Sequence, residues 1–233
     1  MIVDNQSPDQ TLEVAINRGK AVLTDCNFIA WRNNDNYGLG GSHKAAFSYA
    51  IEHGFDYLVV LHGDDQANIH DLLPQLKICT HLQVDCLLGA RFMSDSQLKG
   101  YSWFRTFGNR VYNALFSLVT RSVIYDLGSG LNLYRLETFR KFYFKTFPDD
   151  LTFNYVMLLA SCYYEQKICF FPISWREEDQ RSNVKLFRQA FKVLGLLAGY
   201  ALKRSQFLNS ELRVRALGAY TGQIVYRHEK RSR

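Results

Sequence analysis

Residues 57–66 read Tyr-Leu-Val-Val-Leu-His-Gly-Asp-Asp-Gln, an apolar run followed at once by a cluster of polar residues. A short, strongly apolar run is typical of a buried strand in a mostly parallel sheet, so Tyr57–Leu61 is predicted to be a central strand. In an open α/β sheet, ligands bind outside the carboxyl ends of the strands. The polar residues after this strand therefore stand where a ligand site is expected. They are His62, Asp64, Asp65 and Gln66.

The sequence on both sides of this strand alternates short apolar runs with helical patterns, which is typical of β-α-β units. Further strands are predicted at residues 1–3, 27–31, 84–89, 125–134 and 168–173. Helices are predicted at residues 42–53, 69–81, 103–120, 151–165 and 187–202. Another helix is predicted with Ser7 as its N-cap and Pro8 as its first residue, because Ser7, Pro8 and Gln10 have the spacing of a capping box. We therefore predict an α/β fold, a mostly parallel Rossmann-like sheet with helices on both faces and an amphipathic C-terminal helix.

The composition is that of a globular protein. The chain has 233 residues, of which 47% are hydrophobic and 21% charged, so it can bury a large core without disulfides or a structural metal. The five cysteines include no C-x-x-C pair, which indicates a reduced, cytoplasmic protein. The longest apolar run, Val193–Leu202, has ten residues, whereas a bilayer-spanning helix needs roughly 20. We expect neither a transmembrane helix nor an export signal.

The positive charge is concentrated at the C-terminus. Residues 203–233 contain 8 Lys and Arg residues and 2 Asp and Glu residues, whereas residues 1–202 contain 20 of each sign. A basic tail after an amphipathic helix can bind an anionic membrane surface or nucleic acid. The alternative is a solvated end of the chain without a partner.

Polar residues also follow the first two predicted strands. Asp4 and Asp9 come after the first strand, and Asn36 with the glycine cluster Gly38-Leu-Gly-Gly-Ser42 comes after the second. Mg²⁺ or Mn²⁺ needs only one or two protein carboxylates when phosphate oxygens complete its coordination shell. A metal bound with a phosphorylated substrate is therefore one interpretation of these carboxylates. Ordinary turn and cap chemistry is the other.

Taken together, the motifs resemble a known family. In chain order they are Asp4-x-x-Ser7-x-Asp9-x-Thr11, Asn36-x-Gly38-x-Gly40, His62-Gly-Asp64-Asp-Gln66, Gly89-Ala-Arg91, Asp126-x-x-Ser129-Gly130 and Pro172-Ile-x-x-Arg176. They resemble the family 2 glycosyltransferases of the GT-A fold, and within them the branch of dolichyl-phosphate mannosyltransferases and bacterial polyprenyl-phosphate glycosyltransferases. The resemblance covers residues 1–189 and implies a nucleotide-sugar-binding domain there, with a UDP- or GDP-sugar as donor. Residues 190–233 then form the amphipathic helix and the basic tail.

The resemblance implies roles for residues that bind the donor and the metal. Asp4 resembles the aspartate that contacts the nucleoside, and Asn36 and Arg176 are also expected at the donor. Asp64 resembles the second carboxylate of the D-x-D motif that binds Mg²⁺ or Mn²⁺, and Gln66 matches the glutamine after it. His62 stands in place of the first aspartate of that motif, so Asp65 is the candidate to replace it.

The resemblance also implies residues for the acceptor and for the diphosphate. Arg91 resembles the arginine of a G-S-R motif, and Arg105 with Asn109 resembles a pair that holds an acceptor phosphate. A surface ion pair is the alternative role for each arginine. A late segment is similar to one that closes over the diphosphate. Its candidate residues are Arg181, Ser182 and Lys185.

The chemistry depends on the acceptor. A sugar hydroxyl needs a base to take its proton, and Asp149 or Asp150 is the candidate, although both are also suited to cap a helix. The phosphate of a lipid monophosphate has a second pKa of about 6, so it is ionised at neutral pH and needs no base.

In the family, a strand ending in Pro-x-x-Asn-Glu precedes the strand that ends here at Asp4, and the chain starts without it. We expect an inverting glycosyltransferase of the cell envelope that acts on polyprenyl phosphate at the cytosolic membrane face. The alternative is a truncated or degenerate homologue without activity. Binding of nucleic acid through the basic tail is disfavoured, because residues 1–202 carry no net charge.

Overall fold

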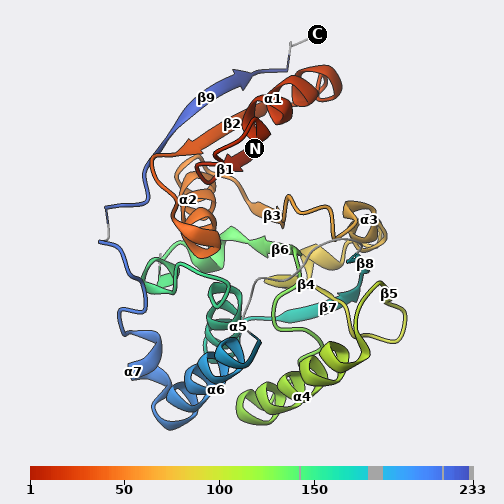
Figure 1. Ribbon diagram of the computed structural model, residues 1–233, viewed down its shortest axis with the longest axis vertical. Coiled ribbons are helices and arrows are strands. Elements are labelled where there is room, and N and C mark those ends of the chain that lie inside the picture. Colours follow the sequence, from red (N-terminus) through yellow and green to blue (C-terminus); the bar gives the residue numbers. More distant parts are fainter. Residues whose placement is uncertain (142, 178–185, 217, 231–233) are drawn as a thin grey trace. The chain divides into compact units, whose positions relative to one another are not determined.

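The computed structural model describes residues 1–141, 143–177, 186–216 and 218–230. The chain forms two compact units, each assembled from segments that are far apart in the sequence (Figure 1). The N-terminal unit comprises Met1–Tyr49, Phe144–Phe153 and Glu211–Arg233, and the central unit comprises Ala50–Tyr143 and Asn154–Ser210. Both units combine strands and helices, so the predicted α/β class is confirmed.

A three-stranded sheet lies in the N-terminal unit. β1 (Ile2–Asp4) pairs in parallel with β2 (Phe28–Asn33). β9 (Gly222–His228) pairs antiparallel with β2 along its other edge, giving the order β1, β2, β9. Residues 222–228, which the charge pattern placed in a basic tail, are thus part of a sheet.

Helix α1 (Thr11–Val22) begins three residues after Pro8, its predicted first residue. The backbone N–H of Ser7 donates a hydrogen bond to Asp4 Oδ1 at 3.3 Å, and the N–H of Thr11 donates to Asp9 Oδ1 at 3.0 Å. The predicted capping box at Ser7 is therefore wrong, because the Asp4 side chain engages Ser7 in a turn that precedes the helix.

The glycine cluster is the first turn of α2 (Gly38–Glu52), which begins before the predicted Ser42. The N–H groups of Gly40 and Gly41 donate to the backbone carbonyl of Asp149 at 2.8 and 3.3 Å. A Cβ atom at Gly40 would lie 2.3 Å from the carbonyl oxygen of Pro148, so only glycine permits this approach. These glycines thus allow the first turn of α2 to pack closely against the backbone at Pro148 and Asp149.

The central unit contains a four-stranded sheet in the order β3, β6, β4, β7. β6 (Leu131–Arg135) runs antiparallel to both β3 (Tyr57–Leu61) and β4 (Cys86–Ala90). β4 is parallel to β7 (Ile168–Pro172). A separate parallel pair joins β5 (Gln97–Lys99) to β8 (Ser174–Arg176).

The bounds predicted for β3 are confirmed, but its predicted central position is wrong. β3 lies at one end of its sheet, and Val59 and Leu61 are exposed. β6 and β4 occupy the interior positions instead, and Leu87, Leu131 and Leu133 from these strands form the buried core of the unit with Phe171.

Five helices belong wholly or mainly to the central unit. They are α3 (Leu73–Lys77), α4 (Trp103–Thr120), α5 (Phe153–Tyr163), α6 (Leu186–Leu202) and α7 (Arg204–Leu208). The bounds predicted for α4 are confirmed. Short 3₁₀ turns cover Ile69–Leu72, Thr80–Leu82, Leu136–Phe139 and Tyr143–Thr146.

The prediction of one continuous helix over residues 69–81 is wrong. The segment forms a 3₁₀ turn, then α3, then a second 3₁₀ turn. Asn68 accepts a hydrogen bond from the N–H of His70, which closes a tight first turn, and Cys79 adopts a left-handed conformation with φ of 59°. The left-handed residue ends the helical geometry.

None of the helices in the described part of the chain is long and apolar enough to cross a membrane.

Gly89 in β4 provides a test of how tightly this core is packed. A Cβ atom there would lie 2.6 Å from Leu131 O and 2.9 Å from Ile173 Cγ2. We expect Gly89→Ala to lower the free energy of unfolding by about 1–3 kcal/mol, measured by denaturant titration. Gly108→Ala in α4 is the control. No atom lies within 4 Å of its added Cβ, so it should raise stability by up to about 1 kcal/mol. Equal effects of the two changes would contradict the packing.

Candidate functional site

The turn after β3 carries the predicted metal ligands of the central unit. Asp64 Oδ1 accepts a hydrogen bond from the N–H of Gln66 at 3.2 Å, and Asp65 has a left-handed φ of 57°. Arg176 donates to Asp65 Oδ2 at 2.7 Å, and its N–H donates to Gln66 O at 2.9 Å. Both contacts tie the turn to β8. Asp65 is thereby committed to Arg176, whereas Asp64 makes one contact with a backbone amide.

His62, which replaces the first aspartate of the D-x-D motif, is a neutral residue in this structure. Its N–H donates to Gly130 O at 2.8 Å, and a Cβ at Gly130 would lie 3.2 Å from the His62 ring. Burial, together with the positive charge of Arg91, lowers the pKa of His62 to about 4. An uncharged imidazole cannot supply the negative charge of the missing aspartate.

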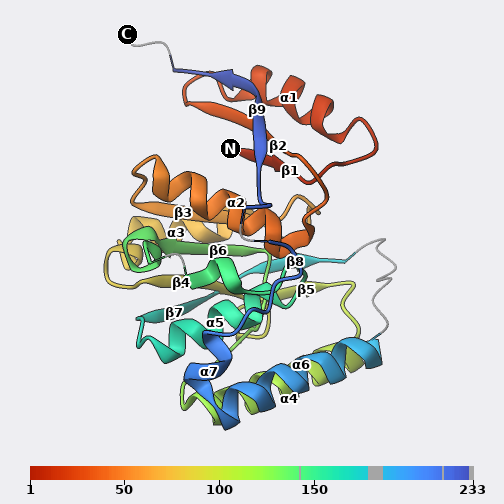
Figure 2. The same ribbon diagram turned by 90° about the vertical axis from the view of Figure 1, so that its left-hand side faces the viewer.

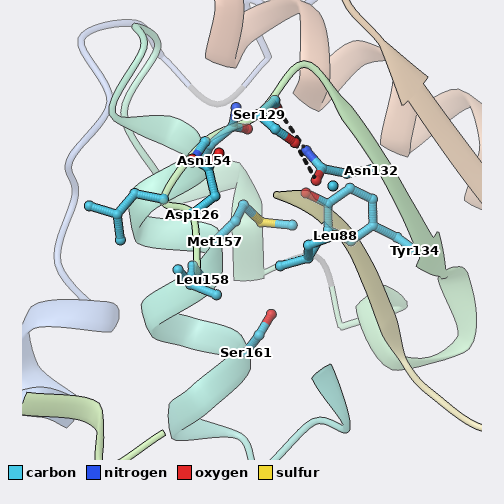
Figure 3. Close-up of a pocket in the computed structure, with 12 residues that line it drawn as sticks. Leu88, Asp126, Ser129, Asn132, Tyr134, Asn154, Met157, Leu158 and Ser161 are labelled. Carbon is cyan, nitrogen blue, oxygen red and sulfur yellow. Dashed lines mark hydrogen bonds between the residues drawn. The ribbon is translucent and has the colours of Figure 1, made fainter. Parts of the chain in front are cut away.

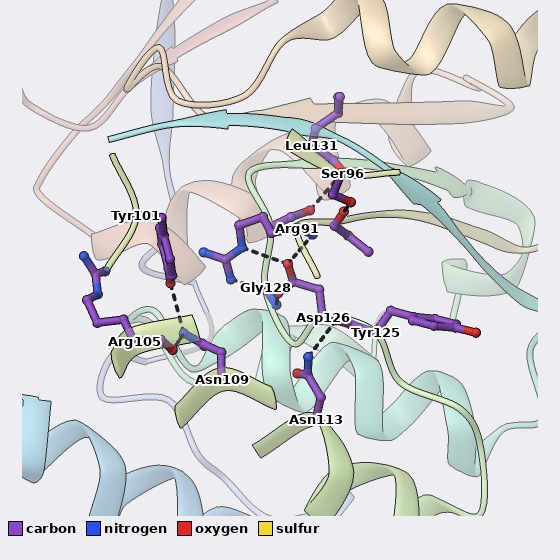
Figure 4. A network of polar contacts seen from close by, with 12 residues as sticks. Arg91, Ser96, Tyr101, Arg105, Asn109, Asn113, Tyr125, Asp126, Gly128 and Leu131 are labelled. Atoms are coloured by element: carbon purple, nitrogen blue, oxygen red, sulfur yellow. Dashed lines mark hydrogen bonds and ion pairs between the residues drawn. The ribbon is translucent and has the colours of Figure 1, made fainter. Parts of the chain in front are cut away.

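Arg91 forms a buried ion pair with Asp126, which the sequence had placed only in a motif (Figure 4). Arg91 Nε donates to Asp126 Oδ2 at 2.7 Å and Nη2 donates to Oδ1 at 2.8 Å. The backbone N–H groups of Arg91 and Gly128 complete the contacts at 2.9 and 3.1 Å. Arg91 is thus in an ion pair, but a buried one and not the surface ion pair considered as its alternative role, and its guanidinium also lies over the rings of Trp175 and Tyr101.

The three residues expected at an acceptor phosphate meet around one aromatic ring, that of Tyr101 (Figure 4). Asn109 Nδ2 donates to the Tyr101 hydroxyl at 2.9 Å and to Arg105 O at 2.8 Å. The guanidinium carbons of Arg105 and Arg91 lie 4.8 and 5.9 Å from the ring centroid. Our sequence reasoning missed Tyr101. Its place directly before the helix that carries Arg105 and Asn109 was the available signal.

Arg105 has an anionic partner of its own, because its Nη1 contacts the carboxylate of Glu177. The Glu177 side chain is largely buried, and its N–H donates to Lys99 O at 3.0 Å, which holds it in place. An anionic acceptor must therefore displace this carboxylate from Arg105.

A small cavity lies beneath the loop that contains Asp126 (Figure 3). It has room for about one water molecule. Ser129 and Asn132 at its edge hydrogen-bond to each other, and Asn154 Oδ1 is buried without a hydrogen-bond partner among the described residues. The cavity suits a structural water molecule and is too small for a sugar.

In the N-terminal unit, Asp4 keeps one carboxylate oxygen available. Asp4 is buried, and Arg32 Nε lies 3.6 Å from its Oδ2. Oδ2 accepts no hydrogen bond from the part of the chain that the structure describes. Asn36, in contrast, accepts hydrogen bonds from Asn5 and from the N–H of Gly38. A buried acceptor without a partner favours Asp4 as a ligand-binding residue.

Asp149, one candidate for the base, holds segments of the N-terminal unit together. Its Oδ1 accepts hydrogen bonds from Lys44 Nζ and from the Tyr220 hydroxyl, both at 2.6 Å, and its Oδ2 accepts one from the N–H of Val214 at 3.0 Å. Burial alone would raise the pKa of Asp149, but these hydrogen bonds outweigh it and hold the pKa below its usual value. A carboxylate with a lowered pKa and occupied oxygens is a poor base.

Asp150, the second candidate, accepts hydrogen bonds from the N–H and the hydroxyl of Thr152 at 2.9 and 2.6 Å, just before α5. These contacts form a turn that leads into the helix. The three residues predicted to close over the diphosphate, Arg181, Ser182 and Lys185, lie outside the described residues.

The predicted residues are thus divided between the units. The N-terminal unit contains Asp4, Asn36, Asp149 and Asp150. The central unit brings together Arg91, Arg105 and Asn109 around Tyr101, and separately Asp65, Gln66 and Arg176 next to Asp64.

Comparison with known proteins relates this arrangement to a family. The sequence model of the family described as "Glycosyl transferase family 2" matches residues 1–143. The Uncharacterized protein MJ1222 of Methanocaldococcus jannaschii is 26% identical over 141 residues, which are 60% of this chain and 55% of the relative. The chain thus spans about half the length of that relative.

Two solved structures have a similar fold. Glucosyl-3-phosphoglycerate synthase from Mycobacterium tuberculosis, in complex with uridine diphosphate, matches with a TM-score of 0.58 at 13% identity, over 85% of this chain and 67% of that one. TarS 1–349 from S. aureus matches with a TM-score of 0.54 at 14% identity, over 90% of this chain and 59% of that one. TarS is also known in complex with UDP-GlcNAc. At these identities the likeness shows the fold.

The ion pair between Lys44 and Asp149 yields a prediction for stability. The side chains of Lys44 and Asp149 are 1% and 12% exposed, and replacing Asp149 by Asn leaves the ammonium group without its counter-charge. We expect Asp149→Asn to lower the free energy of unfolding at neutral pH by about 3 kcal/mol, measured by denaturant titration.

The same variant should change the response to acid. Because the folded-state pKa of Asp149 lies below its unfolded value, its stabilisation is complete at neutral pH and is lost as the pH falls through the folded-state pKa. Between about pH 5 and pH 2 the wild type should therefore lose more stability than Asp149→Asn. Asp25→Asn, at an exposed position of the same unit, is the control and should behave as the wild type. Parallel acid profiles of Asp149→Asn and the wild type would refute this role.

Proposed function

Since the chain belongs to glycosyl transferase family 2, we propose that it transfers a sugar from a nucleoside diphosphate donor to the phosphate of a polyprenyl lipid. The observation that carries this proposal is the cluster of Arg91, Arg105 and Asn109 around Tyr101. Arg105 is the group of this cluster that an acceptor phosphate could engage, because Glu177 can be displaced from it, whereas Arg91 is held in its bidentate pair with Asp126. Arginine forms strong charge-assisted hydrogen bonds with phosphate oxygens.

The state of the two candidate bases favours a phosphate over a sugar hydroxyl as acceptor. Asp149 and Asp150 are both occupied by hydrogen bonds within the N-terminal unit. A lipid phosphate needs no base, because its second pKa of about 6 leaves it ionised at neutral pH. In the proposed reaction a phosphate oxygen attacks the anomeric carbon while the bond to the nucleoside diphosphate breaks, so the diphosphate leaves with both bonding electrons. Inversion at the anomeric carbon follows from this single displacement.

For the donor we propose a UDP-sugar, with a GDP-sugar as the alternative. Glucosyl-3-phosphoglycerate synthase and TarS are both known in complexes with uridine nucleotides, which supports testing UDP-sugars first. Asp4 is the residue with an available buried oxygen for a donor hydroxyl or base. We assign Arg181, Ser182 and Lys185 to the leaving diphosphate on the resemblance alone.

Mg²⁺ or Mn²⁺ fits the residues after β3. Asp64 has no cationic partner among the described residues, whereas Asp65 is paired with Arg176, and the side chain of Gln66 carries an amide oxygen as a further candidate ligand. One carboxylate suffices when diphosphate oxygens supply other ligands. When bound, the ion would neutralise charge on the leaving diphosphate.

Metal dependence is testable by calorimetry. We expect UDP or GDP to bind in the presence of Mg²⁺ or Mn²⁺ and about tenfold or more weakly in EDTA, and we expect Asp64→Ala to lose this difference. Asp95→Ala, at an exposed position of the same unit, should keep it. Equal affinity of the wild type with metal and with EDTA would remove the ion from the proposal, and absence of binding under both conditions would favour the inactive homologue.

The acceptor site is tested with paired variants of Arg105 and its partner. Arg105→Ala should lower the rate of transfer from a nucleotide sugar to polyprenyl phosphate about 100-fold, since a charge-assisted hydrogen bond contributes about 1.5–3 kcal/mol. Glu177→Gln should instead lower the KM for the lipid phosphate, because the competing carboxylate is gone. Neither change should alter donor affinity. A raised KM in Glu177→Gln would show that the Glu177 charge does not compete with the acceptor.

A further inference from the structure

Helix α4 carries an apolar stripe on its exposed side. Trp103 is 78% exposed, Phe107 61% and Leu118 76%, and Phe104 and Val111 are exposed as well. At 100° per residue these side chains fall on one side of the helix, opposite the buried Asn113 and Phe116. A helix on the surface of a protein in water normally exposes charged and polar residues on that side.

Helix α6 repeats this pattern next to α4. Phe191 is 73% exposed and Leu202 82%, and Leu194 is exposed between them. Val193, Leu197 and Tyr200 on the opposite side are buried. α4 and α6 belong to the central unit and are in contact, and Figures 1 and 2 show them side by side. We call the exposed apolar side chains of the two helices the α4–α6 face.

Basic residues without acidic ones lie on these helices and directly after them. Residues 103–121 contain three arginines and no acidic residue, and residues 186–204 contain four basic residues and no acidic one. The rest of the chain has 21 Lys and Arg residues against 22 Asp and Glu residues. Arg110, Arg121 and Lys203 are exposed. The two apolar stripes are therefore accompanied by basic residues and by no acidic residue.

From these observations we infer that the α4–α6 face docks on the surface of a membrane that carries anionic lipids. An exposed stripe of aromatic and aliphatic side chains flanked by basic residues is the pattern of helices that lie in the plane of a membrane interface. A protein partner would require acidic residues to complement the basic ones, whereas an anionic bilayer supplies negative charge and an apolar interior at once.

Docking through this face also bears on where Arg105 and Asn109 lie, and this step rests on the proposed function. Arg105 and Asn109 lie in the first two turns of α4, the helix that carries Trp103 and Phe104. A polyprenyl phosphate keeps its chain in the bilayer and its phosphate at the surface. Arg105 and Asn109 lie on the side of α4 opposite the stripe, so docking places them about one helix diameter, roughly 10 Å, from the membrane surface.

Sedimentation of the full chain with vesicles tests docking without donor or acceptor. We expect it to sediment with vesicles of phosphatidylcholine and phosphatidylglycerol and much less with phosphatidylcholine alone. The triple variant Phe104→Ser, Phe107→Ser, Leu118→Ser should bind about tenfold or more weakly. The matched control changes three exposed apolar residues elsewhere, Val14→Ser, Ile78→Ser and Val214→Ser, and should bind as the wild type. Circular dichroism checks that each variant is folded.

A second pair of variants isolates the charge. Arg110→Gln, Arg121→Gln, Lys203→Gln should lose affinity for the anionic vesicles about fivefold for each residue changed, whereas Arg18→Gln, Lys77→Gln, Arg140→Gln should lose much less. Equal binding by the α4–α6 variants and their controls would overturn the inference. The inference would also be overturned if light scattering showed that the wild type is a dimer and that only the triple serine variant is a monomer. A second copy of the chain would then cover the α4–α6 face.

The two proposals fail separately. A chain that docks through this face but transfers no sugar would overturn the proposed function and leave docking intact. A chain that transfers sugar to a lipid phosphate in detergent but does not bind anionic vesicles would overturn docking alone.

Discussion

The bidentate ion pair between Arg91 and Asp126 holds together the part of the central unit on which its polar cluster depends. Burying two charges costs several kcal/mol unless hydrogen bonds satisfy both groups, and here the backbone N–H groups of Arg91 and Gly128 add to the two guanidinium contacts. The pair joins the end of β4 to the loop before β6. It also holds the guanidinium over Trp175 and near Tyr101, the ring on which Arg105 and Asn109 converge.

The N-terminal unit uses a similar device. Lys44 and Asp149 join α2 to a segment 105 residues away, and Tyr220 from the stretch before β9 completes the contact. In both units these buried charged groups are thus paired with each other and stabilise the fold. Among the described residues, few have the capacity to bind something else. Asp4 and Asp64 retain carboxylate oxygens, and Arg105 holds a carboxylate that another anion could replace. This distribution supports the proposed transfer to a phosphate, which needs no protein base.

Local patterns predicted the elements whose signal is contained in their own residues. Tyr57–Leu61 and Trp103–Thr120 were predicted with the bounds that the structure has, because apolar runs and helical periodicity are local properties. The start of α1 was not predicted, because a side chain of the preceding strand, Asp4, takes the Ser7 N–H. Periodicity also could not tell which side of α4 is buried. Its apolar stripe of Trp103, Phe107 and Leu118 lies in the exposed position that the pattern normally reserves for polar residues.

The sequence by itself determined the α/β class, the family and most strand and helix positions, since each depends on residues close together or on motifs in a fixed order. Only the tertiary structure decided the partner of each charged group. Arg91 lies 35 residues from Asp126, and nothing in the spacing distinguishes Asp126 from other carboxylates that could neutralise it. The same holds for the pairing of β9 with β2 across the length of the chain. Electrostatic and backbone pairing depend on distance in space, and a linear sequence contains no direct record of which distant groups the fold brings within 3 Å of each other.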